Sequence, residues 1–247
     1  RGHAQKRAYA INSMIIFEEN SLLVKACIPT GAALDVFVVT FTGRENNPPV
    51  SHGSAERFFL KNRIPALHFI SKANHWWHSG DFLPALDRVR GELARYGAQQ
   101  IVTYGSSMGG YGALVAAPRL GAVRAVVSVP QASVDPVDVP WETRWRKDIK
   151  RIDFRHRVGP ELGAVDVYAI FDPFFAIDRM HVDVLRRYAH VHEIHTPFAE
   201  HGASMLLKEV NLLEPVTLGA IYGKRGIGTE IRLQMRQRRG ASPLAMG

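Results

Sequence analysis

The chain of 247 residues contains 46% hydrophobic and 22% charged residues, which is enough length and apolar content to bury the core of one domain. It contains no apolar run of the roughly 18 residues that a membrane-spanning helix needs, and a single cysteine, Cys27, excludes a disulfide within the chain. The net charge of +8 is not accompanied by a nucleic-acid-binding motif, so we interpret it as solvated surface and expect no nucleic-acid partner.

The N-terminus is basic, but no apolar stretch of the kind found in secretory signals follows it. We therefore expect a cytoplasmic protein, which is consistent with the absence of disulfides. Residues 1–14 are given no role in the predicted fold. The oligomeric state is left open.

Strand and helix patterns alternate along the chain. Continuous β-branched and aromatic runs predict buried strands at 35–42, 65–71, 100–104, 123–129, 165–171 and 190–196. Helical spacing predicts helices at 54–63, 82–96, 178–188, after the glycine-bearing turn that follows 104, and from about Gly202 onward. This alternation predicts an α/β fold with a mostly parallel central sheet and helices on both faces. In such sheets ligands bind beyond the carboxyl ends of the strands.

Two segments interrupt the alternation. More than thirty residues separate two predicted strands, and we interpret 131–163 as a small inserted cap, because structureless connections of that length are uncommon without a function. Basic residues crowd the end of the chain. We predict one domain over 1–223 and a basic C-terminal tail over 224–247.

The segment with the clearest chemical meaning is GSSMGGYGAL, which begins at Gly105 and contains the pattern G-x-S-x-G centred on Ser107. It follows a predicted strand and opens a predicted helix, which is the context that a nucleophile at a strand-to-helix turn requires. Gly105 and Gly109 leave room where the two backbones approach. The first turn of the helix offers free N–H groups and a dipole that favour developing negative charge at Ser107.

This segment resembles the nucleophile elbow of the α/β-hydrolase superfamily, especially its esterase-like members with a Ser-Met-Gly-Gly sequence. The resemblance extends to the order of elements over 35–213. It implies an α/β-hydrolase fold and a serine nucleophile, Ser107, followed along the chain by an acid and then by a histidine base.

His201 lies in the loop after the last predicted strand, where the family places its base, with His195 as the reserve candidate. For the acid, Asp172 directly follows its strand in an Asp-Pro pair and ranks ahead of Asp178, which an N-terminal helix cap would also explain. Asp135 ranks third.

The oxyanion of such a reaction needs two backbone N–H donors. We expect the amide of Met108 to be the first. The second should come from the loop after the strand at 35–42, from Thr42 or Gly43. Arg44, in the same loop, is a candidate contact for an acidic substrate group and equally a solvated side chain.

Four tryptophans are candidates for the wall of a substrate pocket: Trp76, Trp77, Trp141 and Trp145. Trp76 and Trp77 can equally anchor their loop on the core. Trp141 and Trp145 would share one face of a helix, under the cap or as its attachment. His75, His78 and Asp81 have a weak metal-like spacing without a fourth ligand, and we expect no metal.

These residues together predict a serine hydrolase that cleaves a small carboxylic ester or thioester through an acyl-enzyme and uses no cofactor. An acyltransferase with the same triad is the nearest alternative. A non-catalytic binding protein on the same fold is the alternative from another class.

Overall fold

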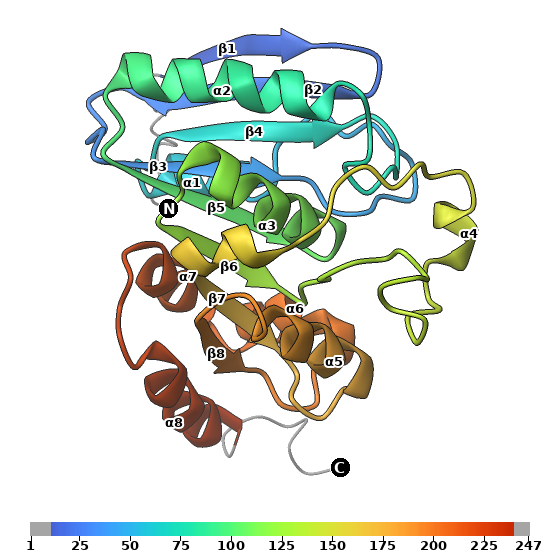
Figure 1. Cartoon of the computed structure of the whole chain (residues 1–247). Helices are drawn as coiled ribbons and strands as arrows, with labels where there is room; N and C mark the ends of the chain where they lie inside the picture. Colours follow the sequence, from blue (N-terminus) through green and yellow to red (C-terminus); the bar gives the residue numbers. More distant parts are fainter. Residues whose placement is uncertain (1–10, 240–247) are drawn as a thin grey trace.

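The computed structural model describes residues 11–239 of the chain (Figure 1). Over this range the strands are β1 Ile11–Glu18, β2 Leu22–Pro29, β3 Val36–Phe41, β4 Ala66–Ser71, β5 Gln100–Ser106, β6 Arg124–Ser128, β7 Asp166–Phe171 and β8 Val191–His195. The helices are α1 Glu56–Lys61, α2 Phe82–Tyr96, α3 Met108–Leu120, α4 Arg146–Ile149, α5 Ala176–Leu185, α6 Ala203–Glu209, α7 Leu213–Ile221 and α8 Ile227–Arg239, with 3₁₀ turns at Pro160–Ala164 and Glu200–Gly202.

All of these strands join one sheet in the order β1-β2-β4-β3-β5-β6-β7-β8. Strand β2 pairs antiparallel with β1 and β4, whereas every pair from β4 through β3 to β8 is parallel. The predicted fold class is therefore confirmed. The parallel strands place the loops that follow β3, β5, β6, β7 and β8 at one end of the sheet, and Figure 1 shows α4 and its flanking loops standing beyond the ends of β3 and β6.

The first strand corrects one expectation. Residues 1–14 were given no role, but residues 11–14 belong to β1 and pair with β2 from Ile11–Pro29 to Met14–Ala26. A β-bulge between Ile15 and Phe17 interrupts this register. The segment around Cys27, LLVKACIP, has the pattern of a buried strand and forms β2, but β1 was missed because an edge strand gains its stability from pairing with its neighbour, which local pattern does not report. Residues 1–10 lie outside the described part of the chain.

The C-terminal boundary also differs from the expectation. Residues 227–239 form α8 and not a separate tail, because Ile227, Ile231 and Met235 recur at a spacing of four and bury one helix face against the sheet. The basic residues around them obscured this stripe. The remainder of the predicted tail, 240–247, is outside the described residues.

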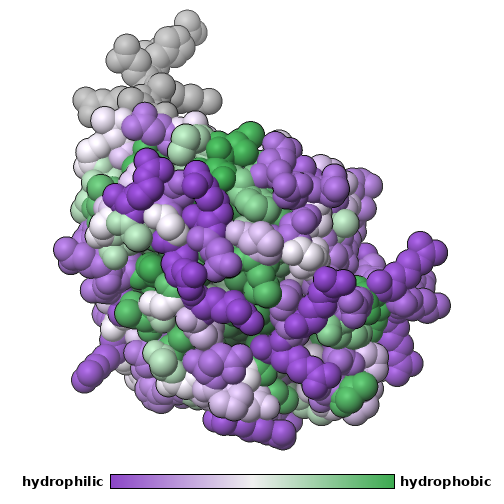
Figure 2. Space-filling view, turned by 45° about the horizontal axis from the view of Figure 1, so that its top comes forward, coloured by the Kyte–Doolittle hydropathy of each residue, from purple (hydrophilic) through white to green (hydrophobic). Residues whose placement is uncertain are grey.

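The charged side chains spread over the surface. Figure 2 shows apolar groups interspersed with hydrophilic ones on the face it presents. Of the helices within residues 11–239, none has the length and apolar character needed to span a bilayer.

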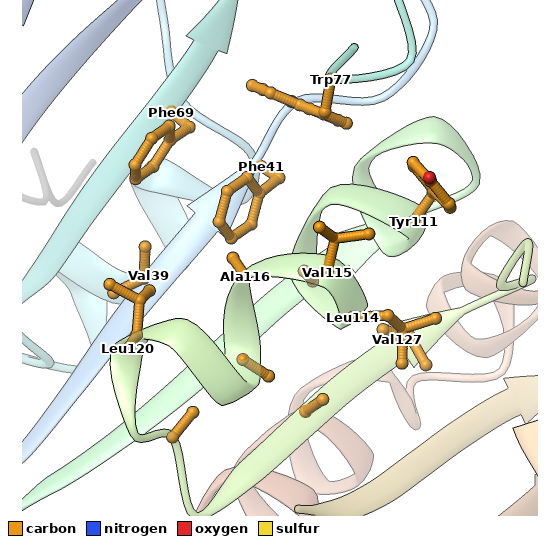
Figure 3. Close-up of a cluster of buried hydrophobic side chains, with 14 of the residues drawn as sticks. Val39, Phe41, Phe69, Trp77, Tyr111, Leu114, Val115, Ala116, Leu120 and Val127 are labelled. Carbon is orange, nitrogen blue, oxygen red and sulfur yellow. The ribbon is translucent and has the colours of Figure 1, made fainter. Parts of the chain in front are cut away.

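Buried side chains form two clusters, one on each face of the sheet. Helices α2, α3 and α5 cover one face, and α1, α6, α7 and α8 cover the other. In Figure 3, Phe41 and Phe69 from the strands lie beside Val115 and Ala116 of α3, with Trp77 above them. Helix α3 is buried along nearly its whole length, so the turn that precedes it is held on a rigid element.

Candidate active site

Ser107 lies at the turn between β5 and α3 with φ 53° and ψ −119°, in a region that non-glycine residues rarely occupy. Such a conformation costs on the order of 1–3 kcal/mol and persists only where the surroundings impose it. The Ser107 amide donates to the Ser128 carbonyl of β6 at 3.0 Å, and the Ser107 carbonyl accepts from the Tyr111 amide at 3.0 Å. The turn is thus fixed from both sides.

The two glycines of the motif are required by backbone contacts. A Cβ atom on Gly105 would overlap the Gly109 carbonyl, and a Cβ atom on Gly109 would overlap the Phe41 carbonyl of β3. Strand β5, helix α3 and strand β3 therefore approach more closely than any side chain permits, as the spacing of the motif predicts.

The structure brings Ser107, His201 and Asp178 into one hydrogen-bonded chain. His201 Nδ1 lies 2.8 Å from Asp178 Oδ2 and 3.1 Å from Oδ1, and His201 Nε2 lies 3.0 Å from Ser107 Oγ. Because a carboxylate faces Nδ1, the imidazole proton resides there, and Nε2 accepts from the Ser107 hydroxyl. Asp178 is completely buried, and the His201 side chain is 27% exposed.

The ranking of the two acids does not match this geometry. Asp172 does not contact His201; its carboxylate accepts from the Phe174 amide and the Glu200 amide, each at 2.9 Å. It ties the loop after β7 to the loop that carries His201. Asp178 is not the N-terminal cap of α5 either, because that position is Phe175, and Asp178 points inward from the first turn.

The remaining candidates from the sequence lie elsewhere. His195 pairs with Glu193 at 2.7 Å on β8. Asp135 accepts from the Val137 amide at 2.9 Å and forms an ion pair with Arg157.

Candidate oxyanion donors converge at the start of α3. Met108 is the first residue of α3, where backbone N–H groups have no partner within the helix. The Thr42 amide is already used, because it donates to the Phe69 carbonyl at 3.1 Å, and the Thr42 hydroxyl accepts from the Ser71 amide. Gly43 approaches the elbow, since a Cβ atom placed on it would lie 3.3 Å from the Ser106 carbonyl oxygen. Of the two expected loop donors, the geometry therefore favours Gly43 over Thr42.

The paired tryptophans support the elbow and do not line an open pocket. Trp76 and Trp77 are both 0% exposed. The Trp77 indole N–H donates to the Met108 carbonyl at 2.9 Å, and a Cβ atom on Gly112 would lie 2.6 Å from the Trp77 ring. Trp77 thus buttresses the first turn of α3, and Trp76 packs against Trp145 with ring centroids 5.6 Å apart.

The tryptophans of the 131–163 insertion lie apart from each other. Trp141 packs against His181 at 4.6 Å, whereas Trp145 lies 5.8 Å from the His201 ring. They do not share a helix face, because neither residue lies in a helix, and α4 begins only at Arg146. Arg44 forms an ion pair with Asp148 of α4 at 2.6 Å, so its partner is the insertion.

Residues of the insertion that sequence reasoning missed surround the acid. Arg144 Nη1 donates to Asp178 Oδ1 at 2.9 Å, and the same guanidinium forms an ion pair with Glu142, 2.6 Å from Nη2 to Oε2. His181 Nε2 lies 3.0 Å from Glu142 Oε2. No motif marks these residues, and the sequence distinguishes this segment only by the density of basic residues from Arg144 to Arg157.

These contacts fix the charge of each group. Burial alone raises the pKa of Glu142, but hydrogen bonds from His181 and Arg144 outweigh it and lower that pKa to about 2. Burial lowers the pKa of His181, which favours the neutral ring. For Arg144, burial opposes the charge, but Glu142 and Asp178 together raise its pKa, so it stays cationic.

Gln131, three residues after β6 ends at Ser128, is a further polar side chain close to Ser107. It is 0% exposed, and its Oε1 lies 3.4 Å from Ser107 Oγ. Its Nε2 has no hydrogen-bond partner among the described residues. Since the orientation of a glutamine amide is an assignment, turning it over would direct Nε2–H at Oγ. In either orientation the Gln131 amide group faces Ser107 Oγ.

Two groups of side chains in the described part of the chain have ligand atoms close enough for a metal ion: Cys27 with Glu56 and His68, and Asp166 with His190 and His192. Neither includes His75, His78 or Asp81. In this loop His78 Nδ1 accepts from the Arg155 amide, and Asp81 accepts from Ser21. These side chains therefore have structural partners.

Comparison with known proteins gives the fold. No family model matches the chain, and no curated protein matches its sequence. Among solved structures, a bacterial heroin esterase superposes with a TM-score of 0.55 at 12% identity over 87% of this chain and 84% of that one. EstE1, a thermostable carboxylesterase from a metagenomic library, gives 0.55 at 14% identity over 87% and 89%. The capsule O-acetyltransferase of Neisseria meningitidis serogroup A gives 0.56 at 12% identity over 81% and 93%.

The chain therefore has the α/β-hydrolase fold, and the resemblance predicted from the elbow is confirmed at that level. At such low identity the superpositions establish the architecture alone.

Proposed function

We propose that the protein is a serine hydrolase that cleaves a carboxylic ester or thioester. The observation that carries this proposal is the chain of contacts from Ser107 through His201 to Asp178, at a strained strand-to-helix turn. This arrangement supplies a nucleophile, a base within hydrogen-bond distance, and an acid that orients the base. The esterases among its structural neighbours are consistent with this chemistry.

The first half-reaction forms an acyl-enzyme. Ser107 Oγ attacks the carbonyl carbon while His201 Nε2 takes the hydroxyl proton. The carbonyl oxygen becomes an oxyanion, which the amides of Met108 and Gly43 stabilise. The intermediate collapses as His201 gives its proton to the leaving alcohol or thiol. Asp178 holds the ring and stabilises the transient imidazolium.

The second half-reaction returns the free enzyme. His201 takes a proton from water, and the resulting hydroxide attacks the acyl carbon. The second oxyanion collapses, the acid leaves, and His201 returns the proton to Ser107. Ser107, His201, Asp178 and the two backbone amides supply every proton transfer and charge stabilisation in both halves.

Transfer of the acyl group to an alcohol or amine is the second candidate, because the fold is shared with an O-acetyltransferase. It needs the same residues and differs only in the acceptor. Adding a graded series of alcohols during turnover separates the two. A transferase forms the new ester in preference to the free acid.

The test combines a fluorophosphonate probe with p-nitrophenyl esters of graded chain length. We expect wild type to label at Ser107 and to hydrolyse the esters, and Ser107→Ala and His201→Ala to lose activity by several orders of magnitude. Ser204→Ala is the matched control, since its hydroxyl bonds to Ser128 and not to the triad. A wild type that neither labels nor turns over any ester is a binding protein and contradicts the proposal.

A further inference from the structure

The segment between β6 and β7 does more than cover the site. It brings a partly buried cation to the acid of the triad. Asp178 on α5 has a side-chain exposure of 0%, and the Arg144 side chain that reaches it is 19% exposed. The two residues are 34 positions apart, so their contact depends on how residues 131–163 dock.

The two oxygens of Asp178 divide their partners. Oδ2 makes the shorter contact to His201 Nδ1, at 2.8 Å, and Oδ1 accepts from Arg144 Nη1 at 2.9 Å. A carboxylate held at one oxygen only can rotate about its last bond. With a separate partner on each oxygen, the plane of the carboxylate is fixed relative to the imidazole.

Arg144 is itself held in place. Its Nε and Nη2 both donate to Glu142, at 3.1 Å to Oε1 and 2.6 Å to Oε2. Glu142 is anchored in turn by His181, one turn after Asp178 on α5. The guanidinium fork thus spans two carboxylates, which a lysine ammonium cannot do with the same geometry.

A buried aspartate needs a countercharge wherever it occurs, so a contact with arginine alone can be purely structural. Two observations go beyond that. Arg144 Nη1 also lies 3.2 Å from His201 Nδ1, where both nitrogens carry protons and share Asp178 as their acceptor, and Trp145, the next residue, packs near the His201 ring. The same short stretch therefore contacts both the acid and the base.

We propose that Arg144 is a positioning residue of the triad, and that the triad is competent only when the 131–163 insertion docks this residue against Asp178. The inference rests on the proposed function. The docking has a second anchor at the other side of the site, where Arg44 after β3 holds Asp148 of α4. The insertion then contributes a positioning residue to the triad.

The charge of Arg144 has a consequence for pH. His201 contacts Asp178 on α5 and Arg144 in the insertion. Glu142 lies behind Arg144, His181 behind Glu142, and Glu200 precedes His201 in the chain. Removing the cation leaves the carboxylates of Asp178 and Glu142 beside the base without their counterion. The acidic limb of the kcat/KM profile should then move to higher pH by about one unit.

The experiment compares Arg144→Gln and Arg144→Lys with wild type in kcat, KM and pH profile on the best p-nitrophenyl ester. We expect Arg144→Gln to lower kcat about 10- to 100-fold with a smaller change in KM, because a misplaced base slows chemistry more than binding. Arg144→Lys keeps the charge, so it should lose less and keep the wild-type acidic limb. Arg146→Gln, an exposed side chain two residues on, is the matched control.

Coupling to Asp178 separates positioning from general destabilisation. In an Asp178→Asn background, Arg144→Gln should cause no further loss of kcat, because the group through which it acts is gone. Thermal unfolding of each variant verifies that the kinetic constants are compared between folded proteins. A further full loss in the double variant, or wild-type kcat and pH profile in Arg144→Gln, overturns the inference and leaves the hydrolase proposal intact.

One readout does not need turnover. The proton NMR signal of the His201 Nδ1–H, identified by its absence in His201→Ala, reports the contact with Asp178 directly. It should shift in Arg144→Gln and stay in place in Arg146→Gln. An unchanged signal in Arg144→Gln contradicts the inference even if the substrate of the enzyme is never found.

Discussion

Exchanging one carboxylate for an amide distinguishes the two aspartates that follow β7. In Asp178→Asn, the side chain keeps its shape and one acceptor oxygen, but the charge that faces His201 Nδ1 at 2.8 Å is lost. The amide group can donate to the imidazole and so select the tautomer that cannot accept from Ser107. We expect kcat to fall about 10³- to 10⁴-fold, or about 4–5.5 kcal/mol of transition-state stabilisation, with little change in KM.

The matched variant is Asp172→Asn. Asp172 accepts one backbone N–H on each oxygen, from Phe174 and Glu200, so the amide must turn one of its own N–H groups toward a donor. The loss of this hydrogen bond costs about 1–3 kcal/mol of unfolding free energy. Activity should fall by about tenfold at most, through the loop that carries His201. Burst-phase and steady-state kinetics on p-nitrophenyl esters, with urea unfolding of both variants, give the comparison. If folded Asp172→Asn loses as much kcat as Asp178→Asn, the acid has been misassigned.

Two further predictions concern the elbow and the buried acid of the insertion. Gly109→Ala should lower the free energy of unfolding by about 3 kcal/mol or more, because the new Cβ would overlap the Phe41 carbonyl. In Gly91→Ala the new Cβ on α2 meets nothing within 4 Å, so this control should gain up to about 1 kcal/mol from helix propensity. Equal urea midpoints for the two variants would contradict this prediction. The pKa of Glu142 is lowered in the folded state to about 2 from 4.5, so its contribution is present above about pH 4.5 and is lost as the pH falls toward 2. Unfolding free energy measured against pH should therefore fall more steeply between pH 5 and 2 in wild type than in Glu142→Gln, and parallel curves would disprove the assignment.

Local sterics made much of the fold and the nucleophile predictable. Gly105 and Gly109 are required where the backbones of β5, α3 and β3 approach closely, and this requirement produces the short G-x-S-x-G pattern in the sequence. The continuous apolar strands that become β3 to β8 are equally local. His201 was found because it follows the last strand, whose position the alternation of elements defines.

The acid was less accessible to sequence reasoning. Asp172 and Asp178 both follow β7, and which of them faces His201 depends on where α5 begins and on the direction of its first turn. Arg144 and Glu142 were missed because their partners on α5, Asp178 and His181, lie more than thirty residues away in the sequence. Helix α8 was not predicted because its three buried apolar residues, Ile227, Ile231 and Met235, lie in a segment rich in basic residues.

The bulge between Ile15 and Phe17 lies on a strand at the edge of the sheet, where a second chain could pair. Strand β1 is an outer strand of the sheet, and an outer strand offers unpaired N–H and C=O groups to any chain that approaches in extended form. Met14 and Ile15 are about half exposed on this strand, so an uninterrupted β1 would combine an open backbone with apolar side chains. An irregular strand bends and twists away from such an approach. A bulge at this position is one of the features by which sheet edges avoid pairing with a second chain.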